Sequence, residues 1–98
     1  MAVSYEQARE TVLREVAPTW NTGTFCLDDR QITENDEYYV FNVGAREFVV
    51  DGDESYELYG GVPVVYKSDG SFGWLPSVLV GTDPTVHSRP NPGPTLRV

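Results

Sequence analysis

The sequence predicts an α+β domain, with one N-terminal helix packed on a four- to five-stranded, mainly antiparallel sheet. Three observations lead to this prediction. An amphipathic segment occupies residues 4–16, segments rich in aromatic and β-branched residues follow it, and a tight Asp-Gly turn joins two of those segments. A chain of 98 residues forms a single domain. We place this domain at residues 1–84.

The N-terminal helix has a defined start, a buried stripe and a defined end. Ser4 can cap the amide of Gln7, and the Gln7 side chain can return a bond to Ser4, as in a capping box. Pro18 ends the helix, because the residue before a proline avoids the helical conformation. Apolar residues recur at three- and four-residue spacing and should face the sheet. They are Tyr5, Ala8, Val12 and Val16.

The strands follow in order along the chain. Residues 24–28 and 38–43 alternate or are rich in aromatic and β-branched residues, with a turn expected at 34–36 between them. Residues 47–50 read as a short third strand or an edge segment. Residues 62–67 form the next strand, with Pro63 near its start, where a missing backbone donor is tolerated. Gly70 suits the tight hairpin that leads to residues 71–75.

The end of the chain has a different composition. Residues 78–80 are expected to form a short turn or an extended piece. Residues 81–84, which contain a glycine and a proline, then interrupt the regular structure. Three prolines then fall within residues 90–94. This stretch has little to bury, so we predict that residues 85–98 form an extended or disordered proline-rich tail.

The net charge of −8 is concentrated in one part of the sequence. Residues 28–57 carry ten acidic residues against Arg30 and Arg46. Such a field repels nucleic acid and anionic membranes and attracts basic proteins. We therefore expect one continuous acidic patch, available to a basic protein partner. The alternative is a solvated surface that only keeps the protein soluble.

The stretch DGDESYELYGG, residues 51–61, is the densest part of that region. As a calcium loop it fails, because Tyr56 stands where the sharp turn needs glycine and Val62 where a bidentate glutamate belongs. A catalytic carboxylate pair would need a walled pocket, of which the sequence gives no sign. His87 and Cys26 are too far apart in sequence to suggest a nucleophilic pair. We expect no enzyme, no cofactor and no metal site.

Protein binding remains, because tyrosines interleaved with carboxylates combine rigid anchors with charges that steer a partner. The same tyrosines could equally pack onto the sheet as lids of the core. The predicted contact residues are Asp51, Asp53, Glu54, Tyr56, Glu57 and Tyr59.

Two motifs, GGVPVVYKSDGS at residues 60–71 and LPS at residues 75–77, resemble the YrhB-like family of bacterial immunity proteins, also called the immunity protein 35 family. The resemblance extends over most of residues 3–84. It implies a short N-terminal helix followed by a sheet, and a non-enzymatic protein that binds and neutralises a cognate toxin domain. Many toxin domains are basic enzymes that act on nucleic acid, so an acidic surface suits this role.

A competing hypothesis is a small domain that binds a ligand or forms a homodimer through an uncovered sheet face. Such a face could be lined by Tyr39, Phe41, Phe72 and Trp74. The sequence contains no run of 18 apolar residues and no recognisable secretory signal. We therefore expect a cytoplasmic protein with no membrane partner, and the single Cys26 is expected to be a small buried apolar residue.

Overall fold

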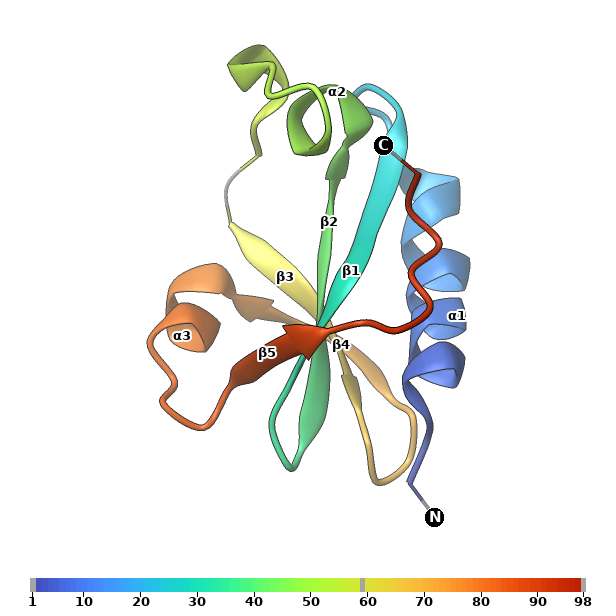
Figure 1. The fold of residues 1–98 in the computed structure, drawn as a ribbon, viewed down its shortest axis with the longest axis vertical. Coiled ribbons are helices and arrows are strands. Elements are labelled where there is room, and N and C mark those ends of the chain that lie inside the picture. The colour runs from blue at the N-terminus through green and yellow to red at the C-terminus, as the bar shows by residue number, and fades with distance from the viewer. Residues whose placement is uncertain (1, 59, 98) are drawn as a thin grey trace.

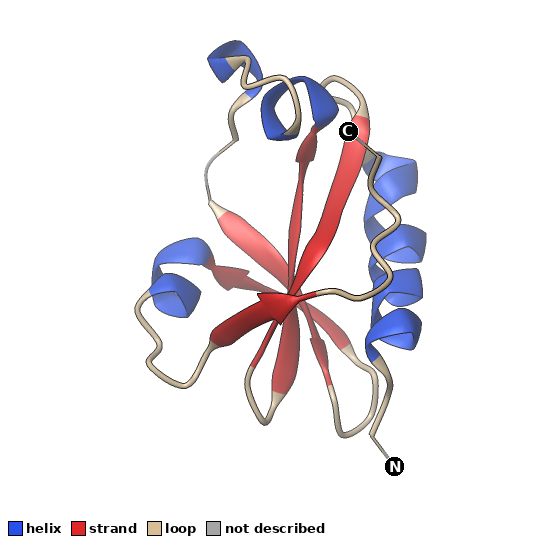
Figure 2. Ribbon diagram, in the orientation of Figure 1, coloured by secondary structure: helices blue, strands red, loops and turns tan. Residues whose placement is uncertain are grey.

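The computed structural model describes residues 2–58 and 60–97, and one N-terminal helix packs on a five-stranded antiparallel sheet (Figures 1 and 2). The strand order is β4-β3-β2-β1-β5. This confirms the predicted α+β fold. The elements are α1 (Tyr5–Val16), η1 (Ala17–Thr19), β1 (Phe25–Glu34), β2 (Tyr38–Ala45), α2 (Arg46–Val49), η2 (Glu54–Tyr56), β3 (Gly61–Tyr66), β4 (Phe72–Pro76), α3 (Ser77–Gly81) and β5 (His87–Pro90).

Helix α1 begins at the predicted capping box and covers one face of the sheet. The Gln7 amide donates to Ser4 Oγ at 3.2 Å, and the Ser4 amide donates to Gln7 Oε1 at 2.9 Å. The Tyr5 ring stacks on Phe41 at 5.2 Å between centroids and meets Tyr39 edge-on at 5.5 Å. The helix therefore buries Tyr39 and Phe41 of β2, which are not available as an open face for a ligand or a dimer.

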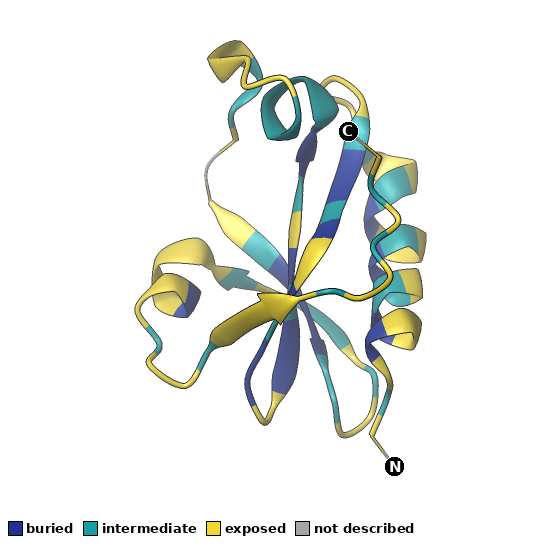
Figure 3. Cartoon of the chain, viewed as in Figure 1, coloured by how far each residue is buried: buried dark blue, intermediate teal, exposed yellow. Residues whose placement is uncertain are grey.

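The core lies between α1 and the sheet (Figure 3). Burying each large apolar side chain contributes about 1.5–3 kcal/mol of transfer free energy. This small cluster therefore supplies most of the hydrophobic free energy that favours folding. Its members are Tyr5, Ala8, Val12, Val16, Leu27, Ile32, Tyr39, Phe41 and Val65. Cys26 is also buried, as predicted, and is a free thiol.

Strand β1 bends sharply in its middle. Asp28 pairs with Asn42 and Thr33 pairs with Val40, so four residues of β1 oppose the single residue Phe41. Such a bulge bends the strand and leaves backbone groups without ladder partners. Those groups need partners elsewhere. The C-terminal segment supplies them.

The C-terminal segment differs from the prediction, which ended the domain at residue 84. Residues 87–90 are extended, but they form β5, which pairs antiparallel with β1 from Gln31 to Glu34. Asn91 then donates from its side chain to the Asp29 carbonyl at 2.7 Å and from its amide to the Arg30 carbonyl at 3.0 Å. The sheet needs these residues, because they satisfy the bent part of β1. We call residues 91–97 the C-terminal strap.

Two short segments predicted as strand or turn are helical. Residues 47–50 fall mostly in α2, and residues 78–80 fall in α3. The physical reason for α2 is that residues beyond Ala45 have no neighbouring strand with which to form a ladder. Strand β2 already ends at Ala45 opposite Phe25, the first residue of β1, so the chain beyond Ala45 has no strand to pair with. A turn of helix then satisfies its backbone locally, as in the bond from the Val50 amide to the Arg46 carbonyl at 2.9 Å.

Strands β2 and β3 separate at Pro63. Their ladder runs from Tyr38 opposite Tyr66 to Val40 opposite Val64 and stops there. Pro63 has no amide hydrogen to donate, so pairing cannot continue through it. Beyond this point the two strands diverge toward α2 and η2, as Figure 1 shows. The divergence opens the surface described next.

Candidate functional site

The gap between the diverging strands forms two adjoining depressions, which we call the β2–β3 cleft. One has a volume of about 350 Å³ and lies under α2 and η2, with Phe48, Val49 and Tyr56 in its wall. The other has a volume of about 410 Å³ and is lined by residues that include Trp20, Val62 and Trp74. Asn42, Val43 and Leu58 line both depressions. The cleft is therefore continuous across Leu58.

Apolar side chains reach solvent in this cleft. Leu58 is 51% exposed and Trp74 is 52% exposed. A large aromatic residue and a leucine beside a concave surface are the features of a site that receives an apolar group from a partner. The sequence singled out Trp74 only as part of a possible ligand or dimer face, and it did not single out Leu58. The sequence signal for the cleft itself is Pro63, where the β2–β3 ladder stops.

The predicted contact residues lie beside the cleft, in the connection from α2 to β3. Asp51, Asp53 and Glu54 are exposed. Asp53 is partly engaged in local structure, since its Oδ1 accepts from the Ser55 amide at 3.1 Å and from the Ser55 hydroxyl at 2.6 Å. These two bonds lower the pKa of Asp53. Asp53 therefore caps η2 and remains ionised at neutral pH.

The two predicted tyrosines are placed differently. Tyr56 is half-buried and packs over Gly23, where an added Cβ would come within 2.9 Å of the Tyr56 ring. Tyr56 thus packs the loop onto Gly23 and also lines the cleft, while its role as a partner contact stays a prediction. Glu57 is half-buried. Tyr59 lies outside the described residues.

The expectation of one continuous acidic patch is wrong. Asp28 forms an ion pair with Arg30 at 2.7 Å, and Asp29 and Glu34 are buried and bonded within the fold. Asp36 and Glu37 lie at the turn between β1 and β2, at the opposite end of the sheet from η2 (Figure 1). The physical reason is strand alternation and register, which send neighbouring acids to different faces. The exposed acids beside the cleft are Asp51, Asp53 and Glu54.

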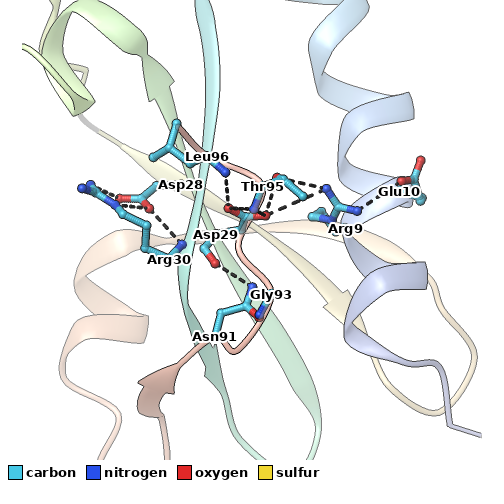
Figure 4. Close-up of polar contacts among 9 residues, drawn as sticks. All are labelled: Arg9, Glu10, Asp28, Asp29, Arg30, Asn91, Gly93, Thr95 and Leu96. Atoms are coloured by element: carbon cyan, nitrogen blue, oxygen red, sulfur yellow. Dashed lines mark hydrogen bonds and ion pairs between the residues drawn. The ribbon is translucent and has the colours of Figure 1, made fainter. Parts of the chain in front are cut away.

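Asp29 joins the C-terminal strap to β1 and α1, as Figure 4 shows. Its side chain is 1% exposed. Its carboxylate accepts from the Thr95 amide at 2.9 and 3.0 Å, from the Thr95 hydroxyl at 2.5 Å and from the Leu96 amide at 3.0 Å. Arg9 lies 3.9 Å from the same carboxylate. Every short contact of Asp29 is thus made with the protein's own strap.

The pKa of Asp29 follows from this arrangement. Burial alone would raise it, but the hydrogen bonds from Thr95 and Leu96 and the charge of Arg9 outweigh burial and lower the pKa. Asp29 is therefore ionised at neutral pH. A buried carboxylate in a cavity can act as a catalytic base. Here its acceptor positions are used by the strap, so the structural role explains it.

Glu34 makes a second internal ion cluster. Its Oε1 accepts from Lys67 Nζ at 2.6 Å, and its Oε2 accepts from Arg89 Nε at 2.9 Å. Burial favours a higher pKa, but the bonds from Lys67 and Arg89 lower it overall. Glu34 thereby ties β1 to β5 and to the turn after β3. The negative charge of Glu34 is thus neutralised within the fold and is not available to a partner.

Within the described ranges, no three side chains among histidine, cysteine, aspartate and glutamate gather closely enough to hold a metal ion. His87 is exposed on β5. The same part of the chain contains no helix that is both long and apolar enough to cross a bilayer.

Comparison with known proteins gives no relative. No family model matches the chain, and neither the curated proteins nor the solved structures contain a significant match.

Proposed function

We propose that this chain is a non-enzymatic binding protein that docks a basic protein partner on the β2–β3 cleft and its acidic rim. The observation that carries the proposal is the position of Asp51, Asp53 and Glu54 beside a cleft in which Leu58 and Trp74 are half-exposed. Interfaces commonly combine a desolvated apolar centre with a polar rim. The cleft supplies the centre and the acids supply one side of the rim.

The two parts of this surface have different roles. Exposed charges mainly steer the encounter and raise the association rate, whereas buried apolar anchors mainly set the dissociation rate. Asp51 and Glu54 belong to the first group. Leu58 and Trp74 belong to the second, because truncating a central anchor typically costs about 2 kcal/mol or more.

The partner class we favour is a bacterial toxin domain, so the chain would act as a cytoplasmic immunity protein. The resemblance of residues 60–71 and 75–77 supports this choice, and the residues of the first motif include Pro63, which opens the cleft. A toxin domain that acts on nucleic acid carries a positive surface. An acidic rim on the immunity protein complements it.

The test needs a candidate toxin, which a toxin gene beside this one would supply. We expect its toxic domain to bind the purified chain, and Leu58→Ser to weaken binding at least tenfold, since about 1.4 kcal/mol is tenfold in affinity. Leu79→Ser is the matched control. Leu79 is 55% exposed but lines neither depression of the cleft. Equal losses for the two variants, or no binding by the wild-type chain, would contradict the proposal.

A second candidate function is binding of a small apolar ligand in the same cleft. Its two depressions, of about 350 and 410 Å³, fall within the range of ligand sites. A thermal-shift screen of small apolar compounds distinguishes the two functions. A ligand that stabilises the wild-type chain but not Leu58→Ser would favour this alternative.

A further inference from the structure

We propose that β4 is the pairing edge of a symmetric homodimer, in which β4 strands from two copies align antiparallel and join two sheets into one. The proposal concerns the outer backbone edge of the sheet, which meets the β2–β3 cleft at the Trp74 side chain. It rests on the outward-pointing backbone groups of β4 and on the absence of charged residues from this strand.

The register shows which groups of β4 are free to pair. The Tyr66 amide donates to the Ser71 carbonyl at 2.9 Å, and the Ser77 amide donates to the Gly60 carbonyl at 3.0 Å. In an antiparallel ladder, bonded pairs alternate with non-bonded pairs. Trp74 opposes Pro63 and Phe72 opposes Val65, which are the non-bonded positions. The amides and carbonyls of Phe72 and Trp74 therefore point away from β3.

The two edges of the sheet are treated differently. Proteins protect an edge with short strands, charges or proline, because an open edge pairs with other chains. Both edge strands are short and both end in a proline, but β5 carries Arg89 whereas β4, with the sequence FGWLP, carries no charge. An edge strand without a charge is open to pairing with another strand.

A second copy is the occupant that fits the charge. A two-fold axis brings identical surfaces together, so in a chain of net charge −8 an uncharged strand can meet its own copy without like-charge repulsion. The exposed acids Asp51, Asp53 and Glu54 lie in the connection before β3 and not in β4. A basic partner would gain no charge attraction from β4. An uncharged strand that can align with itself is suited to self-pairing.

Apolar surface continues from β4 into the helix that follows. Trp74, Pro76 and Val78 line an open depression of about 640 Å³, and Val78 is 75% exposed. A second copy would cover part of this surface. Stable interfaces bury about 800 Å² per partner, and a five-residue strand with a few exposed apolar side chains supplies less. We therefore expect a dissociation constant in the micromolar range.

Sedimentation equilibrium of the purified chain, from about 1 to about 500 µM, brackets such a constant. We expect a monomer–dimer equilibrium. Trp74→Pro should weaken it at least tenfold, because proline removes one outward amide while leaving the bonds to β3 in place. Should Trp74→Pro fail to fold, Trp74→Lys, which places a charge on the axis-facing strand, provides the same test. Leu58→Ser, in the cleft, should dimerise as the wild type does.

Amide exchange gives an independent result. The Phe72 and Trp74 amides should exchange more slowly at high protein concentration than at low concentration, and amides of β5 should not change. A wild-type chain that stays monomeric at about 500 µM would overturn the proposal. So would Trp74→Pro and Trp74→Lys variants that dimerise like the wild type. Partner binding at the cleft is measured separately with Leu58→Ser, so either proposal can fail alone.

Discussion

Replacing Asp29 with asparagine should release the C-terminal strap and destabilise the fold by about 2 kcal/mol. The substitution keeps the shape of the side chain but removes its charge and turns one oxygen into a donor. That oxygen now accepts from the Thr95 hydroxyl at 2.5 Å and from the Thr95 amide. Hydrogen bonds to a charged group contribute about 1.5–3 kcal/mol each.

The expected loss is smaller than the sum of the bonds. The Leu96 amide, at 3.0 Å from the other oxygen, keeps its acceptor in the asparagine variant. The strap can also leave the buried site and hydrate its amides in water. These two effects limit the cost to about one such bond plus the lost attraction of Arg9, or about 2 kcal/mol. For a domain of this size, that is a decrease of about 8–15 °C in melting temperature.

Urea denaturation measures the loss, and Asp28→Asn is its matched control. Asp28 is the preceding residue, and it bonds locally to Arg30, whose side chain is 44% exposed. Such a pair contributes at most about 1 kcal/mol. Amide exchange at Thr95 and Leu96 should accelerate in Asp29→Asn only. If both variants lose equal stability, or if these amides stay protected, Asp29 does not hold the strap.

Two further predictions follow from the same structure. Acid should destabilise the protein, because the hydrogen bonds of Asp29 and Glu34 hold their pKa values in the folded state below those in the unfolded state. Their contribution to the free energy of unfolding is present above the unfolded pKa and is lost as pH falls through the folded pKa. Urea midpoints measured between about pH 7 and pH 3 should fall, less steeply in Asp29→Asn, and equal slopes would contradict this assignment. Gly23→Ala should lower the free energy of unfolding by about 2 kcal/mol, as measured by thermal unfolding, because Gly23 has φ of 65° and a Cβ would come within 2.7 Å of Glu47. Gly52→Ala should lower it less, because Gly52 has φ of 73° but open space around it.

Local signals in the sequence predicted the parts of the fold that depend on neighbouring residues. The capping box at Ser4 and the hairpin at Gly70 were both confirmed. Each depends on residues only a few positions apart. The prediction of a strand at residues 47–50 was wrong because strand pairing is not local: the apolar run has no partner beyond the start of β1.

The strap and the buried acids could not be predicted for a related reason. The proline-rich composition of the tail suggested that it had nothing to bury, but its role is to supply backbone partners to the bent strand β1. Asp28 and Asp29 read as two equal acids in the sequence. Only the bend and the docking of Thr95 distinguish the exposed side of β1 from the buried one.

The contact role of the predicted site residues stays a prediction, and the structure shows only which of them are exposed. The acids at residues 51, 53 and 54 are exposed, as a contact surface requires, whereas the wider acidic region is divided among separate places and internal bonds. Leu58 and Trp74 come from different segments and meet at the cleft because the β2–β3 ladder stops before Pro63. Sequence patterns alone do not predict that these two residues lie close together.

The central claim is that the acids beside the β2–β3 cleft steer a basic protein partner to it. Its most direct test is the rate of association with the toxin domain that the chain is found to bind, measured by stopped flow over a range of salt concentrations. The double variant Asp51→Asn with Glu54→Gln should associate more slowly at low salt and show a flatter salt dependence. The double variant Asp36→Asn with Glu37→Gln removes the same charge at the opposite end of the sheet and should behave as the wild type does. Equal effects of the two variants, or association that does not depend on salt, would contradict the claim.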